Sequence, residues 1–188
     1  MPQGRGGRKP PGEGGGPAGG RPPVERPNTW EAAIALLAMR AYSTHELEQR
    51  LRRRGYAADE IAAVVARLTA ARYLDDAEYA RAWARSRARR ISLGPARLAR
   101  ELRARGVDGA HIAEALAESA TEEDPRVLAE AAAARRLKGL QGVPAAAARR
   151  RLAAFLARRG FATAVILEVC RRHFPHLPDA GEAEEGPA

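Results

Sequence analysis

The chain has 188 residues, enough for one ordinary domain or for an array of smaller units. It carries 32 basic and 23 acidic residues, a net charge of +9, which favours an acidic partner: a nucleic acid or an acidic protein surface. A single cysteine excludes an internal disulfide framework and fits a reducing, cytoplasmic compartment. The longest run without a charged residue, 139–148, falls short of the roughly 18 residues that a membrane-spanning helix needs.

Both ends of the chain are poor in apolar residues. Residues 1–28 contain nine glycines and seven prolines, and residues 174–188 carry four acidic residues among glycine and proline. Neither segment has the apolar surface to offset the entropy lost on ordering, so we expect two disordered tails. The N-terminal tail also lacks the apolar stretch of a signal peptide.

One pattern of leucine, glycine and isoleucine occurs three times. Residues four apart lie on one helix face, so the two leucines of each copy predict a buried stripe. A glycine after an arginine-rich turn suits the left-handed end of a helix, and the next apolar residue is expected to pack over that end. The three copies are Leu47, Leu51, Gly55, Tyr56 and Ile61; Leu98, Leu102, Gly106, Val107 and Ile112; and Leu152, Leu156, Gly160, Phe161 and Ile166.

The first unit is expected over residues 29–71. A helix is predicted over Thr29–Ala38, where the apolar residues keep helical spacing. Ser43, followed three residues later by Glu46, fits a capping box that begins the second helix. That helix ends at Gly55, and a third helix follows it.

The second and third units are expected over residues 72–119 and 120–173. Each is predicted to begin with a helix, over Asp75–Arg90 and Pro125–Lys138. Pro95 stands where a helix tolerates proline best, in the first turn of the next helix. Two further helices then follow in each unit, as in the first.

The predicted fold is therefore all-α, with three tandem three-helix repeats that resemble helix-turn-helix units. The β-branched residues never alternate over four or more positions, as a strand would require. A unit of about 45 residues buries little apolar surface alone, so the units are expected to stack into an elongated, curved array.

Arginine carries the main chemical signal. On the predicted helix Asp75–Arg90, the side chains of Arg81, Arg85 and Arg89 share one face, and only Glu78 is near enough to pair with the first two. Like charges at this spacing repel by a few tenths of a kcal/mol each, a cost that an anionic partner would offset. The candidate partner-binding residues are Arg81, Arg85, Arg87, Arg89, Arg90, Arg149, Arg150, Arg151, Arg158 and Arg159.

The aromatic and acidic residues of the second unit are expected to be structural. Tyr79 and Trp83 are one turn apart and favour a place in the core, with Arg87 over the end of the stripe. Asp75 and Asp76 fall where a helix begins, and a carboxylate there accepts backbone N–H bonds.

We expect no metal site, catalytic residue or cofactor. Cys170, His173 and His176 have a suitable spacing for a metal, but no fourth ligand lies nearby and Cys170 falls on the apolar face of its repeat. The four histidines form no recognisable catalytic set with serine, cysteine or aspartate. No phosphate-binding glycine loop is present, so ATP binding is not expected.

From the residues alone, three classes of protein remain open. The first is an interaction protein whose basic array lies along an acidic filament or groove. The second is a helix-turn-helix DNA-binding protein or transcriptional repressor, although the third helices, such as 58–68, carry few polar side chains for reading bases. The third is a neutral helical scaffold, which leaves the positive charge unexplained.

The second unit resembles the middle repeat of the RecX regulatory proteins, bacterial modulators of the RecA recombinase. The resemblance is dense over Trp30–Glu118 and continues more weakly over Pro125–His173. It rests on Arg72-Tyr73-Leu74-Asp75-Asp76, Tyr79-Ala80, Trp83, Arg85-Ser86-Arg87, Gly94-Pro95, Arg97-Leu98, Glu101-Leu102 and Arg105-Gly106-Val107.

This resemblance implies a regulator rather than an enzyme. Proteins of this family bind RecA filaments and inhibit filament growth, and with it the ATPase, strand-exchange and coprotease activities of RecA. We therefore expect a cytoplasmic monomer whose partner is the RecA filament, with its basic face meeting acidic RecA surface or bound single- or double-stranded DNA.

Overall fold

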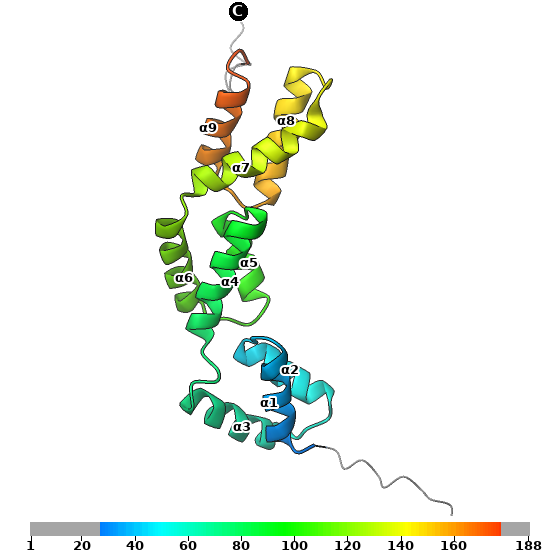
Figure 1. Cartoon of the computed structure of the whole chain (residues 1–188), viewed down its shortest axis with the longest axis vertical. Helices are drawn as coiled ribbons and strands as arrows, with labels where there is room; N and C mark the ends of the chain where they lie inside the picture. The colour runs from blue at the N-terminus through cyan, green and yellow to red at the C-terminus, as the bar shows by residue number, and fades with distance from the viewer. Residues whose placement is uncertain (1–26, 178–188) are drawn as a thin grey trace, which may run out of the picture.

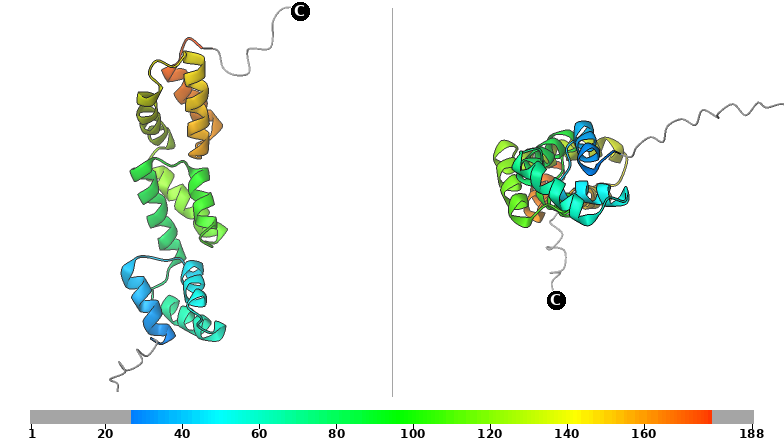
Figure 2. Two further views of the ribbon diagram at one scale, coloured as in Figure 1. Left: turned by 90° about the vertical axis from the view of Figure 1, so that its right-hand side faces the viewer. Right: turned by 90° about the horizontal axis from the view of Figure 1, so that it is seen from below.

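The computed structural model describes residues 27–177, which fold into three helical units that follow one another along the long axis of a gently curved molecule (Figures 1 and 2). The described residues contain nine α-helices, one short 3₁₀ turn and no strand. The predicted all-α array of three-helix repeats is confirmed. The tails expected over residues 1–26 and 178–188 lie outside the described residues.

Each unit contributes three consecutive α-helices to this array. The first unit holds α1 (Thr29–Met39), α2 (Thr44–Arg53) and α3 (Ala58–Ala70). The second holds α4 (Asp76–Ile91), α5 (Pro95–Arg103) and α6 (Gly109–Glu122). The third holds α7 (Pro125–Leu137), the 3₁₀ turn η1 (Lys138–Leu140), α8 (Ala145–Arg158) and α9 (Thr163–His173).

The repeated leucines and isoleucines form the cores of the units. In every unit both leucines of the second helix and the isoleucine of the third helix are buried. The glycine that ends each second helix is left-handed, with φ of 78° at Gly55, 73° at Gly106 and 85° at Gly160. The next residue, such as Val107 or Phe161, is apolar and packs over the helix end in the second and third units, as predicted.

Three local expectations need correction. Asn28, assigned to the N-terminal tail, is the N-cap of α1 and forms a complete capping box with Glu31. Ser43 caps α2 through its hydroxyl, but Glu46 does not close the box, because its carboxylate is drawn towards the second unit. Phe174, assigned to the C-terminal tail, is buried in the core of the third unit, and Leu177 packs against that core.

The second helices of neighbouring units meet end to end. At the junction of the first two units, the Ser43 hydroxyl at the start of α2 donates a hydrogen bond of 2.6 Å to the Arg105 carbonyl at the end of α5. At the next junction, the Gly94 amide at the start of α5 donates to the Arg159 carbonyl at the end of α8, at 2.8 Å. Helix-end groups that would otherwise lack partners thus satisfy one another between units.

The glycines also permit the close approach of the units. A Cβ atom at Gly160 would overlap the backbone of Arg97, and one at Gly94 would overlap the carbonyl group of Gly160. A Cβ atom at Gly106 would overlap the side chain of His45. These three positions therefore need glycine for lack of space, and Gly106 and Gly160 need it for their φ angles as well.

Replacing Gly160 by alanine tests this double requirement. The left-handed conformation costs an alanine about 1–2 kcal/mol, and the overlap with Arg97 adds about 1–3 kcal/mol. Gly142 is the matched control, because its φ is 77° but nothing lies within 4 Å of a Cβ there. We expect Gly160→Ala to lower the free energy of unfolding in urea clearly more than Gly142→Ala; equal losses would contradict the tight junction.

Candidate functional site

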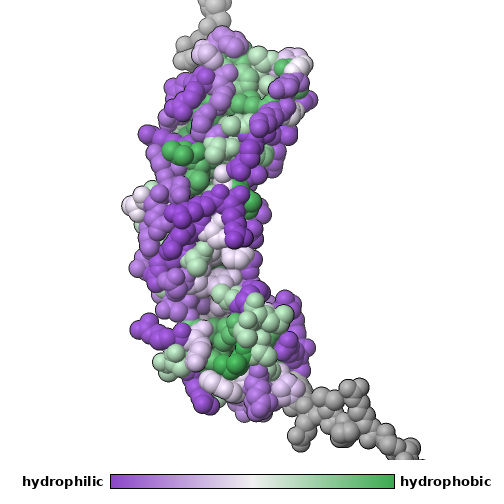
Figure 3. All heavy atoms as spheres, in the orientation of Figure 1, coloured by the Kyte–Doolittle hydropathy of each residue, from purple (hydrophilic) through white to green (hydrophobic). Residues whose placement is uncertain are grey.

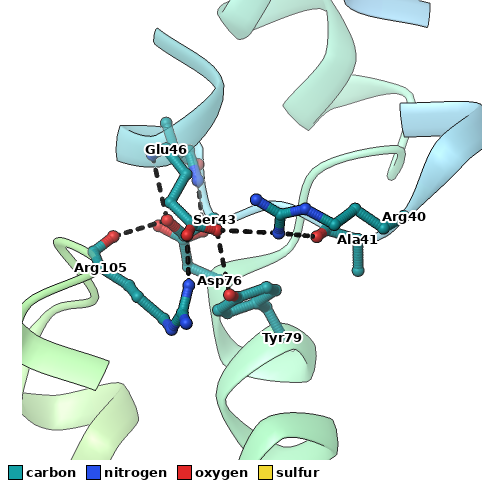
Figure 4. A network of polar contacts seen from close by, with 8 residues as sticks. Arg40, Ala41, Ser43, Glu46, Asp76, Tyr79 and Arg105 are labelled. Atoms are coloured by element: carbon teal, nitrogen blue, oxygen red, sulfur yellow. Dashed lines mark hydrogen bonds and ion pairs between the residues drawn. The ribbon is translucent and has the colours of Figure 1, made fainter. Parts of the chain in front are cut away.

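The carboxylate of Glu46 is the centre of the junction between the first and second units (Figure 4). It accepts a hydrogen bond of 3.0 Å from the Tyr79 hydroxyl and contacts the guanidinium groups of Arg105 and, at 3.4 Å, Arg40. Asp76 ties the same units together, because its carboxylate accepts the Thr44 amide at 2.8 Å. These contacts set the orientation of the first unit on the second.

The surroundings of Glu46 favour its charged form. Burial alone would raise the pKa of Glu46, but the hydrogen bond from Tyr79 and the charges of Arg105 and Arg40 outweigh burial, so the pKa lies below its usual value. For Tyr79, burial and the negative charge of Glu46 raise the pKa of the phenol. The junction therefore holds a carboxylate and a neutral phenol at neutral pH.

The indole of Trp83 contacts two guanidinium groups. Arg105 lies 3.7 Å from the ring centroid and Arg87 lies 4.5 Å from it. Tyr79 stacks on Trp83 with the ring centroids 6.1 Å apart. The predicted structural role of these aromatics, with Arg87 over the stripe, is confirmed, and cation–π attraction adds to the junction. The part played by Arg105 was missed, although an arginine precedes the glycine in all three units.

The arginine stripe of α4 is paired with acidic residues of α6. Arg81 lies within 3.9 Å of carboxylate oxygens of Glu114 and Glu118 as well as Glu78. The next two arginines continue the ladder: Arg85 pairs with Glu118 and Glu122, and Arg89 with Glu122 and Glu123. The expectation of unpaired charge on this face is wrong, because α6 packs along α4 and brings acids that no local pattern could supply.

The other candidate arginines fall into two groups. Arg87 contacts Glu101, Arg149 donates to the Leu177 carbonyl at 3.2 Å, and Arg159 donates to the backbone carbonyls of Ile91 and Ser92. By contrast, four are exposed and form no ion pair with a described residue: Arg90, Arg150, Arg151 and Arg158.

Residues 27–177 hold one thiol, and neither a metal-binding group of side chains nor a membrane-spanning helix. No three His, Cys, Asp or Glu side chains there lie close enough together to hold a metal ion. None of the helices in this range combines the length and the apolar character that crossing a membrane requires. Cys170 is a buried thiol on the apolar face of α9, as its place in the repeat predicts.

The fold and the junctions define a tandem-repeat protein of three-helix units joined through the ends of their second helices. Three family models match it in order: the first three-helix domain of RecX over residues 30–68, the second over 75–116 and the third over 122–170. The chain belongs to the RecX family.

Similar proteins of known name support the same family. A "Regulatory protein RecX" of Amycolatopsis mediterranei is 37% identical over 141 residues, which cover 74% of this chain and 80% of that protein. The protein of the same name from Halorhodospira halophila is 41% identical over 134 residues, covering 70% and 79% of the two chains. The crystal structure of RecX from Lactobacillus salivarius has the same fold, with a TM-score of 0.68 at 19% identity, over 77% of this chain and 93% of that one.

Replacing Glu46 by glutamine tests the junction between the first two units. The uncharged amide cannot pair with Arg105 and Arg40, so we expect the free energy of unfolding at pH 7 to fall by about 1–3 kcal/mol. Because the pKa of Glu46 is lowered on folding, its contribution is present above the unfolded pKa of about 4.3 and is lost as the pH falls through the folded value. The variant should therefore lose less stability than the wild type between about pH 5 and pH 3.

The control for this experiment is Glu48→Gln in the same helix. Among the described residues Glu48 pairs only with Arg52, at 2.9 Å on the surface of α2, and such pairs contribute about 0–1 kcal/mol. Chemical denaturation across pH distinguishes the two variants. Equal effects at positions 46 and 48 would show that the Glu46 network does not hold the units together.

Proposed function

We propose that this protein is a non-enzymatic regulator that binds the RecA nucleoprotein filament in the bacterial cytoplasm. It inhibits filament growth, and with it the ATPase, strand-exchange and coprotease activities of RecA, and so modulates DNA repair and recombination. The observation that carries this proposal is the match of all three units, in order, to the RecX domains. The relatives named as regulatory proteins support a role without catalysis.

The shape of the molecule suits a long, repetitive partner. Three units in a line offer three similar surfaces at regular intervals, so one monomer would contact adjacent subunits of a filament. Hydrophilic side chains cover much of the second unit on the face seen in Figure 3. A charged surface of this kind favours a partner bound through salt-sensitive electrostatics.

The exposed arginines of α8 are the best candidates for contact with this partner. Arg150 and Arg151 lack an ion pair with any described residue, whereas the α4 stripe is already neutralised by α6. Binding an anion at Arg150 and Arg151 therefore breaks no ion pair with a described residue, while binding at α4 would first displace the carboxylates of α6. We propose that α8 contributes more to binding than α4.

The transcriptional-repressor alternative is not favoured by the third helices of the first two units. α6 carries Glu114, Glu118 and Glu122 on the face towards α4, which would repel a DNA backbone. The exposed face of α3 is rich in alanine, with few groups able to read base edges.

The direct test of the proposed function is the DNA-dependent ATPase of RecA. We expect the protein, added at substoichiometric amounts to RecA at low salt, to reduce ATP hydrolysis, because one elongated molecule acts on several filament subunits. The inhibition should weaken as salt is raised. An ATPase rate that stays unchanged at every ratio and at low salt would reject the proposal.

Alanine variants of the two arginine sets distinguish the contact faces. Arg150→Ala with Arg151→Ala is expected to weaken inhibition about tenfold without changing the melting temperature, because the variant removes two charge-assisted hydrogen bonds that together contribute roughly 1.4 kcal/mol or more. Arg81→Ala with Arg85→Ala should lower the melting temperature, because it removes the ladder to α6. If the second variant instead weakened inhibition more while melting normally, α4 would be the contact face.

A further inference from the structure

The two junctions between units are built alike but differ in charge. Arg105 and Arg159 occupy equivalent positions, each directly before the glycine that ends the second helix of its unit. At the first junction, Glu46 neutralises Arg105. At the second junction the position equivalent to Glu46 is Arg97, one residue before the first leucine of its unit, and its guanidinium pairs with Glu101 at 3.1 Å. Arg159 therefore has no carboxylate where Arg105 has one.

Further guanidinium groups gather around Arg159. Arg135, near the end of α7, donates to the Ser92 hydroxyl, while Arg159 donates to the Ser92 carbonyl at 3.3 Å. The guanidinium of Arg159 lies 4.7 Å from the centroid of the Phe155 ring and that of Arg136 lies 5.7 Å from it. Burial and the charge of Arg135 lower the pKa of Arg159, which agrees with two cations held close together.

We call this group the junction cluster: Arg135, Arg136 and Arg159. Two exposed arginines, Arg90 and Arg158, stand next to Ile91 and Arg159 in the chain. No member forms an ion pair with any of residues 27–177, and the Nε atom of Arg136 is buried without a hydrogen-bond partner. The carboxylates of the neighbouring helices are engaged elsewhere: Glu101 with Arg87 and Arg97, Glu123 with Arg89, and Glu130 with Arg172 and His173.

We propose that the junction cluster binds the phosphate backbone of single-stranded DNA. Guanidinium groups match phosphate oxygens in two-point contacts, and half-buried ones gain most from such an ion. Three cations at one junction, with two exposed arginines beside them in the chain, favour closely spaced anions, which a nucleic-acid strand supplies at about one per 3.4 Å. Because Arg136 and Arg159 are half-buried, a flexible single strand reaches them more easily than the stiff, convex backbone of a duplex. This proposal deepens the proposed function, since it assigns a site to the DNA of the filament.

The most specific test gives the second junction the charged residues of the first. Arg97→Glu with Glu101→Arg keeps the net charge and introduces the residues found at the equivalent positions of the first unit, Glu46 and Arg50. The new carboxylate should neutralise Arg159. We expect the affinity for a labelled 20-nucleotide oligothymidylate, measured by fluorescence anisotropy at low salt without RecA, to fall about tenfold. The melting temperature should fall by no more than a few degrees, because Arg87 loses its pair with Glu101.

A second variant removes the exposed charges next to the cluster in the chain. Arg90→Gln with Arg158→Gln should weaken oligothymidylate binding to a similar extent and flatten its dependence on salt concentration, by about 0.7 in the logarithmic slope for each phosphate that the protein no longer neutralises. Arg50→Gln with Arg53→Gln is the matched control, because these arginines of α2 are also exposed and form no ion pair with a described residue. The control should bind as the wild type does.

Each other outcome overturns part of the proposal. Equal reductions of affinity in the cluster variants and the control would mean that only overall charge matters. Tighter binding of a duplex of the same length would remove the single-strand assignment, and competition by polyglutamate as strong as that by unlabelled oligothymidylate would point to an acidic protein instead. If the protein inhibits the RecA ATPase but does not bind oligothymidylate, the proposed site is rejected and the proposed function stands. If it binds oligothymidylate but does not inhibit the ATPase, the site stands and the proposed function is rejected.

Discussion

The architecture depends on the way one helix end satisfies another. The last carbonyl groups of a helix and its first amide groups have no partners within the helix, and a short helix has proportionally many of them. Here the carbonyls at Arg105 and Arg159 meet donors at the start of the preceding second helix, namely the Ser43 hydroxyl and the Gly94 amide. The helix dipoles then lie head to tail, so the contact between units is favoured by electrostatics as well as by hydrogen bonds.

The second helix of the third unit begins differently from the other two. The residue of α8 equivalent to Ser43 and Gly94 is Ala148, which is buried inside the helix, because α8 begins already at Ala145 after Pro144. The helix start that receives the glycine end of the next unit in α2 and α5 is therefore not repeated at this position of α8.

The helices and their ends could be predicted from the sequence because the causes are local. A glycine with positive φ, a capping side chain or a proline acts within about one turn, so Gly106 and Pro95 indicate their helix ends without knowledge of the fold. The partners of the charged residues could not be predicted in this way. Arg89 and Glu122 are 33 residues apart, and only the packing of α6 along α4 makes them neighbours. Glu46 is a second example. Its spacing to Ser43 predicted that its side chain would close a capping box, but its carboxylate instead pairs with Arg105 of the second unit.

The net charge of the chain is therefore a poor guide to the surface that a partner meets. Many of the arginines already have partners within the fold. The stripe on α4 pairs with the carboxylates of α6, and Arg87 and Arg105 lie against the Trp83 ring. Arg105 also pairs with Glu46 at the first junction. The second junction has an arginine, Arg97, where the first junction has the carboxylate of Glu46, so Arg159 pairs with no carboxylate of the described residues. The helix-end hydrogen bonds that hold the units together are present at both junctions. A repeat protein can thus vary the chemistry of one junction without changing the geometry of the array.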